Sequence, residues 1–157
     1  MTAACYPDDP GGSLSEDASV PIFDQSRALF VFDGHCAFCS AAAAFVLRYD
    51  RAHRINLTPA QSPLGTALYN HYALRTDDYE TNLLIEHGKL LTKADASIRL
   101  FELLGGIWRI AAIGRLLPRA MRDALYKMIA RNRMRIAGRR EQCFLPTAAQ
   151  RARFIGL

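Results

Sequence analysis

A short apolar segment at residues 28–32 runs directly into Asp33-Gly34-His35-Cys36-Ala37-Phe38-Cys39, and this junction constrains the fold more than any other part of the chain. The segment ALFVF predicts a buried strand, because it is apolar, partly β-branched and ends at an Asp-Gly turn. The Ala-rich sequence from Cys36 to about Tyr49 predicts a helix. We therefore expect a strand that turns into a helix with two cysteines at its start.

Those two cysteines carry the first functional prediction. Residues three apart share one face of a helix, so Cys36 and Cys39 are expected to lie close together. At the helix start, Cys36 meets unpaired backbone N–H groups and the positive end of the helix dipole, which favour its thiolate and lower its pKa. Cys36 is thus the predicted nucleophile and Cys39 the predicted resolving thiol in thiol–disulfide exchange.

The remaining pattern predicts a strand at residues 54–59, a helix opened by Ser62-Pro63, a hairpin around His87-Gly88 and a helix capped by Asp95. The resulting order is strand, helix, strand, helix, strand, strand, helix. It is the order of an α/β thioredoxin-like fold, in which helices flank both faces of a mixed sheet. Residues 107–138 predict extra C-terminal helices, separated by Pro118.

The chain has 157 residues, half of them hydrophobic, which is enough for one substantial core. Residues 1–26 are polar, acidic and rich in Pro, Gly and Ser, and they predict a disordered tail; residues 27–157 predict a single domain with a C-terminal helical extension. The tail does not resemble a secretory or transit signal, so a cytoplasmic location is expected. The apolar region at residues 103–117 is short and interrupted by arginines, which predicts no transmembrane segment.

Basic residues are concentrated near the C-terminus, where residues 109–140 hold ten Lys and Arg against one acid. An amphipathic helix with a polar face of arginines can dock on an anionic membrane or a partner protein. Alternatively, its apolar residues pack on the sheet as an additional layer, which we expect of a chain that needs core. The arginines in question are Arg109, Arg115, Arg119 and Arg122, and the apolar residues are Trp108, Ile110, Ile113 and Leu117. No motif indicates nucleic-acid binding or an oligomeric state.

Three further residues, Asp33, His35 and Cys143, are candidates for the site. Asp33 either fixes the turn or accepts the proton of Cys39, and His35 either stabilises the Cys36 thiolate or is an exposed loop residue. Cys143 is an additional resolving thiol, a metal ligand or an ordinary buried cysteine. Cys5 is expected to be incidental.

A zinc site formed by Cys36, Cys39, Cys143 and a histidine is an alternative to redox chemistry. Because no second CxxC or spaced histidine pair accompanies the first CxxC, the redox interpretation is favoured and no metal is predicted. No nucleotide, flavin or haem motif is visible, so no cofactor is predicted either.

Four segments, FDGHCAFCS, AQSPLG, ADASIRLFELLGG and YKMIARNRMRIAGRREQC, together resemble the DCC family of predicted thiol–disulfide oxidoreductases. The resemblance covers about residues 28–145 and implies a thioredoxin-like fold and a protein or small-molecule thiol or disulfide as substrate. It maps the family's Asp and two Cys onto Asp33, Cys36 and Cys39. The cis-proline of ordinary thioredoxins is replaced around Thr81, and the basic stretch at residues 131–133 either lines the active-site groove or forms surface ion pairs.

Overall fold

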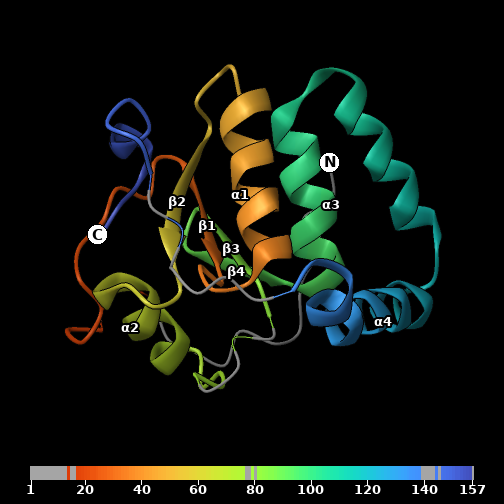
Figure 1. The fold of residues 1–157 in the computed structure, drawn as a ribbon, viewed down its shortest axis with the longest axis horizontal. Coiled ribbons are helices and arrows are strands. Elements are labelled where there is room, and N and C mark those ends of the chain that lie inside the picture. Colours follow the sequence, from red (N-terminus) through yellow and green to blue (C-terminus); the bar gives the residue numbers. More distant parts are fainter. Residues whose placement is uncertain are drawn as a thin grey trace.

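A four-stranded mixed sheet forms the centre of the protein in a computed structural model, shown in Figure 1. The structure describes residues 14, 17–76, 79, 81–138, 144 and 146–156. The strands lie in the order β2-β1-β3-β4, with β1 parallel to β2 and antiparallel to β3, and with β3 and β4 forming a hairpin. Their bounds are β1 Ala28–Phe32, β2 Ile55–Pro59, β3 Leu83–Glu86 and β4 Lys89–Thr92.

Helices cover both faces of this sheet, and side chains of β1 alternate between the two. Phe30 and Phe32 pack under α1 (Ala37–Tyr49) and α3 (Lys93–Leu104), whereas Leu29 and Val31 pack against α2 (Pro63–His71). Every residue of β1 is therefore buried, which explains its continuous apolar sequence. This arrangement confirms the predicted thioredoxin-like α/β fold.

Two further elements follow α3. The 3₁₀-helix η1 (Gly106–Leu116) packs along α3, and α4 (Arg119–Ala137) lies against α1 and α3. Pro118 separates η1 from α4, as the sequence predicted. No helix in the described part of the chain is both long enough and apolar enough to cross a bilayer.

The predicted cap of α3 is wrong. The helix begins at Lys93 with Thr92 as its N-cap residue, and Asp95 lies in the first turn. Asp95 is buried and forms an ion pair with Arg122 of α4, with Arg119 at 3.9 Å. The Asp95 carboxylate therefore connects α3 to α4. A local capping pattern cannot predict a contact between residues that lie far apart in the sequence.

The apolar residues between positions 108 and 117 were expected to pack on the sheet as an additional layer, and this prediction is wrong for three of the four. Trp108 does contact Phe45, Tyr49 and Phe101, with ring centroids 4.8–6.2 Å apart. Ile110, Ile113 and Leu117 are exposed. The expected polar face differs as well, because Arg115 pairs with Glu102 and two of the other arginines pair with Asp95.

Packing extends into part of the expected N-terminal tail. Leu14 and Val20 are buried in the cluster formed by α2 and β1, and Asp17 Oδ2 is hydrogen-bonded to His71 Nδ1. The domain boundary at residue 26 stays a prediction, and Cys5 lies outside the described residues.

The C-terminal segment closes the open side of β2. Phe154 pairs with Leu57 of β2 in an isolated parallel β-bridge. The preceding residue, Arg153, ends the short 3₁₀-helix η2 (Arg151–Arg153) and is buried. Arg153 Nε donates to the Ile55 carbonyl at 3.1 Å, and its Nη2 donates to Asp50 Oδ2 at 2.5 Å. Asp50 also accepts the backbone N–H groups of residues 54 and 55, so this ion pair fixes the turn between α1 and β2.

We expect the Arg153→Met variant to be destabilised by about 3–5 kcal/mol, because removing one partner leaves the buried Asp50 carboxylate without its cation. Urea unfolding followed by far-UV circular dichroism measures this loss. Arg151→Met, which removes an exposed arginine from the same turn, is the matched control. Equal urea midpoints for the two variants would show that the buried pair contributes nothing.

Candidate active site

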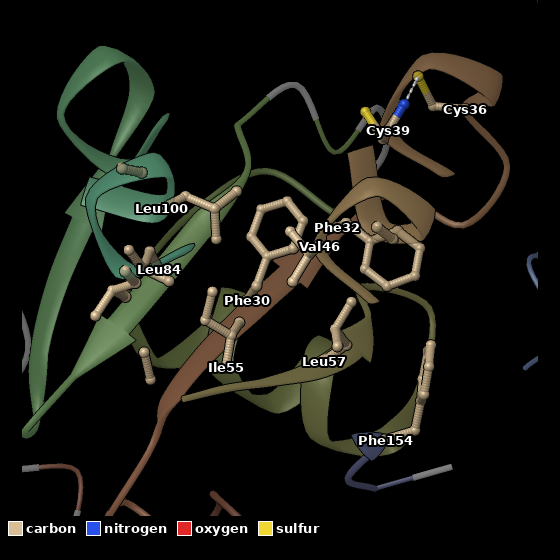
Figure 2. Close-up of a cluster of buried hydrophobic side chains, with 14 residues drawn as sticks. Phe30, Phe32, Cys36, Cys39, Val46, Ile55, Leu57, Leu84, Leu100 and Phe154 are labelled. Atoms are coloured by element: carbon tan, nitrogen blue, oxygen red, sulfur yellow. Dashed lines mark hydrogen bonds between the residues drawn. The ribbon is translucent and has the colours of Figure 1, made fainter. Parts of the chain in front are cut away.

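The two cysteines lie where β1 turns into α1, and the turn makes Cys36 the N-cap residue of the helix. Cys36 has an extended backbone, and its Sγ accepts a hydrogen bond from the Cys39 N–H at 3.3 Å, the dashed line in Figure 2. The predicted helix start is thereby confirmed. The sulfur of Cys36 occupies the position in which an N-cap side chain satisfies an otherwise unpaired helix N–H.

The environment shifts the two thiols in opposite directions. A hydrogen bond from the Cys39 thiol, then the Cys39 backbone N–H and the charge of Arg133, lower the pKa of Cys36 to about 6, against burial and the charge of Asp33. The pKa of Cys39 is raised by the same hydrogen bond, by burial and by the negative charge of Cys36. Near neutral pH the pair therefore holds one thiolate and one thiol.

Both cysteines are free, and both are buried, with Cys36 at 0 % exposure. Phe38, between them, is exposed. The chain after α4 returns to this loop, since the Gly138 carbonyl accepts the Ala37 N–H at 3.3 Å and the Phe144 N–H donates to the Gly34 carbonyl at 3.0 Å. A disulfide reaches Cys36 only after groups around the helix start have moved.

Asp33 is buried and organises the loop before Cys36. Its Oδ1 accepts the His35 N–H at 2.9 Å and the Gln61 side-chain amide at 2.7 Å. The Gln61 Oε1 in turn accepts the Gly34 N–H at 3.0 Å. These contacts support the turn-fixing role that the sequence offered for Asp33.

Gln61 is a site residue that the sequence analysis missed. It follows β2 and precedes Ser62, the N-cap residue of α2, whose Oγ accepts the Gly65 N–H at 3.0 Å. This turn is tight, because a Cβ on Gly65 would lie 2.2 Å from the Pro59 carbonyl oxygen. Because parallel β1 and β2 end at the same sheet edge, a polar residue just after β2 was the available signal.

Arg133 reaches the pair from α4. Its buried guanidinium lies 3.8 Å from Cys39 Sγ and 3.8 Å from Asp33 Oδ2, and it donates to the Tyr79 carbonyl at 3.2 Å. Within the basic stretch at residues 131–133, Arg131 is exposed and Asn132 bonds to the carbonyl of residue 128. Arg133 thus joins α4, the loop before β3 and the cysteine pair.

The structure places the other candidates as follows. His35 is half-buried and contacts Asp33 through its backbone. Thr81 is half-buried before β3, where its carbonyl accepts the Tyr69 hydroxyl, and the described chain contains no cis peptide bond. Cys143 lies outside the described residues. Within the described residues, no group of three or more His, Cys, Asp or Glu side chains is placed to hold a metal ion.

A family model described as DCC1-like thiol-disulfide oxidoreductase matches residues 30–139, which run from β1 through the cysteine pair to the end of α4. The chain belongs to this family. As a DCC1-like protein it is a thiol–disulfide oxidoreductase, which confirms the resemblance and the general activity that the sequence predicted.

Two relatives agree with this membership in the DCC1-like family. The Uncharacterized protein YuxK of Bacillus subtilis (strain 168) is 34% identical over 127 residues, covering 81% of this chain and 93% of the relative. A DCC family protein of Arabidopsis thaliana, whose name includes the word chloroplastic, is 28% identical over 123 residues, covering 78% of this chain and 72% of the relative. No solved structure gives a significant match.

Proposed function

We propose that this oxidoreductase works by dithiol–disulfide exchange through Cys36 and Cys39, with Cys36 as the nucleophile. The observation that carries the proposal is the hydrogen-bonded pair at the start of α1, in which the pKa of Cys36 is lowered to about 6 and that of Cys39 is raised. A thiolate attacks disulfides and a thiol does not, so the difference supports Cys36 as the nucleophile and Cys39 as the resolving thiol.

In the reductive direction, the Cys36 thiolate attacks one sulfur of a substrate disulfide. The substrate S–S bond breaks, a Cys36–substrate disulfide forms, and the other substrate sulfur leaves as a thiolate that takes up a proton. Cys39 then loses its proton and attacks Cys36 Sγ, which releases the second substrate thiolate. The substrate has gained two electrons and the Cys36–Cys39 pair has lost them; the reverse sequence oxidises a dithiol.

Asp33 and Arg133 influence these reaction steps through their effect on the two cysteines. Removing the proton from Cys39 is the difficult part of the second step, because its pKa is raised. The positive charge of Arg133 lowers that pKa, and the carboxylate of Asp33 raises it while offering a base near the loop. We propose Arg133 as a positioning residue for the resolving thiolate, and Asp33 as the organiser of the loop and acceptor of the Cys39 proton.

The proposed substrates are protein or small-molecule disulfides and dithiols, and His35, Thr81 and Cys143 remain proposed auxiliary residues. Because Cys36 is buried, a substrate must engage the protein strongly enough to open the loop around the helix start. The proposed cytoplasmic location would supply the reductants that such a pair needs.

Redox titration of the purified protein tests the proposal. We expect a reversible two-electron transition of Cys36 and Cys39 in thiol–disulfide buffers, followed by alkylation and mass spectrometry. Because a stabilised Cys36 thiolate favours the dithiol form, the midpoint should be less negative than about −270 mV, the thioredoxin value. The Cys39→Ser variant is the control, since it cannot close the pair. A pair that never oxidises, or that holds stoichiometric zinc, would contradict the proposal.

A further inference from the structure

An apolar stripe runs along the side of α4 that faces solvent. Five large side chains on it are between 43% and 66% exposed, and their spacing of i, i+4, i+7, i+8 and i+15 places them on one face of the helix. They are Met121, Leu125, Met128, Ile129 and Ile136. Arg133, on another face of α4, is buried against the cysteine pair. The amphipathic helix therefore presents its apolar stripe outward, where the fold leaves it uncovered.

The 3₁₀ geometry of η1 creates a second exposed apolar row. A 3₁₀-helix has three residues per turn, so side chains at i and i+3 align. One such row faces the protein, with Trp108 against Phe45 and Gly114 against Ile98. Another row points to solvent with exposures between 60% and 84%, and it consists of Ile107, Ile110, Ile113 and Leu116. Exposed rows of this kind on consecutive elements mark an interaction surface.

Three cations flank the apolar stripe of α4. Lys127, Arg131 and Arg135 follow one another at i, i+4 and i+8, and they line a surface hollow of about 540 Å³ together with Met128 and Asn132. No acidic partner is found for these three cations among the described residues. The arginines nearer the start of the segment behave differently, because Arg115, Arg119 and Arg122 pair with Glu102 or Asp95.

Charge decides which occupant this surface fits. Residues 106–137 carry eight Lys and Arg and one acid, so a second copy of the chain would bring like charges together. Apolar rows beside cations that have no acidic partner in the described part of the chain instead match the boundary of an anionic bilayer, where apolar side chains enter the acyl region and cations meet lipid phosphates. A bilayer also needs no matching pocket, and the exposed side chains of both rows can enter its apolar layer directly.

We propose that η1 and the outer side of α4 form a docking face for anionic phospholipid membranes. The two apolar rows enter the boundary between headgroups and acyl chains, and Lys127, Arg131 and Arg135 bind the lipid phosphates. Arg133 remains on the cysteine pair, so docking leaves the redox site assembled at the membrane surface. This proposal goes beyond the exchange activity and does not depend on it.

Cosedimentation of the full-length protein with vesicles tests the docking face. We expect binding to phosphatidylcholine vesicles that contain phosphatidylglycerol, little binding to phosphatidylcholine alone, and weaker binding as salt is raised. Charge reversal of Lys127, Arg131 and Arg135 to Glu should reduce binding to the level of the neutral vesicles. Ile110→Ser combined with Ile113→Ser should weaken it about tenfold or more.

The matched control reverses three exposed cations outside the docking face, Arg51, Lys89 and Arg151, and it should keep most of the binding. All variants alter exposed side chains, and circular dichroism checks their folding. Absence of wild-type binding, equal binding to neutral vesicles, or equal losses in both charge-reversal variants would overturn the proposal. A concentration-dependent dimer without vesicle binding would also overturn it and assign the face to a second copy. Exchange activity in lipid-free buffer is a separate readout, which tests only the redox proposal.

Discussion

Cys36→Ser is expected to reduce disulfide exchange to the uncatalysed rate, whereas Cys39→Ser is expected to leave the protein covalently attached to its substrate. Serine at position 36 is protonated at neutral pH and cannot attack a disulfide. Serine at position 39 leaves the Cys36 thiolate able to attack but removes the thiol that releases the mixed disulfide. Non-reducing electrophoresis and intact mass spectrometry distinguish the two outcomes.

The control for this pair removes the other thiols. A variant with Cys5→Ser and Cys143→Ser retains only Cys36 and Cys39, and it should exchange at the wild-type rate. If that variant loses exchange, Cys143 or Cys5 is the resolving thiol. If Cys36→Ser retains full activity, the nucleophile has been assigned to the wrong residue.

The fold follows from local sequence to an unusual degree because its central strand is buried on both faces. Residues 28–32 are uniformly apolar and end at an Asp-Gly turn, and this pattern predicts a buried strand. The same turn places Cys36 at the N-cap, so the sequence also predicts the lowered pKa of its thiol. Both predictions depend only on neighbours within a few residues.

Predictions failed where distant residues or competing helix geometries decided the outcome. Asp95 has the form of a helix cap, but Arg122, 27 residues later, takes its carboxylate. The apolar residues of η1 suggested a buried layer, but the three-residue repeat turns Ile110 and Ile113 to solvent. No local pattern distinguishes a 3₁₀-helix of this length from an α-helix.

The sequence predicted the two cysteines of the site, but it did not predict the residues that contact them and Asp33 from distant parts of the chain. Gln61 and Arg133 meet Asp33 only because β2 ends beside β1 and α4 crosses α1. The sequence placed Arg133 in a basic stretch but could not separate it from Arg131, since the orientation of α4 decides which one is buried. The sequence did not predict the complete burial of Cys36 either, and under the proposed mechanism the loop has to open before Cys36 can attack.

The lowered pKa of Cys36 also links the stability of the reduced protein to pH. The folded protein binds the Cys36 proton less tightly than the unfolded chain, whose thiol pKa is about 8.5. Stabilisation from the thiolate is therefore fully present above that value, and it is lost as the pH falls through about 6. Part of this stabilisation is due to Arg133, which leads to the second prediction.

Arg133→Met is expected to raise the pH at which Cys36 becomes reactive. The variant removes a positive charge that lowers the pKa of both cysteines, and it leaves Asp33, which raises them, without its buried cation. The midpoint of iodoacetamide alkylation against pH should move from about 6 in the wild type to a value higher by about one unit. Trapping of mixed disulfides by substrate should slow at neutral pH for the same reason.

Two variants separate charge from packing in that experiment. Arg133→Lys keeps the positive charge and should keep the midpoint within a few tenths of a pH unit of the wild type, because Coulombic attraction to a thiolate depends on charge and distance. Arg131→Met removes an exposed arginine from the same helix and should leave the midpoint at about 6. If Arg133→Met shares the wild-type midpoint but unfolds more easily, Arg133 is a structural cation and the proton affinity of Cys36 is set by the helix N-terminus and Cys39 alone.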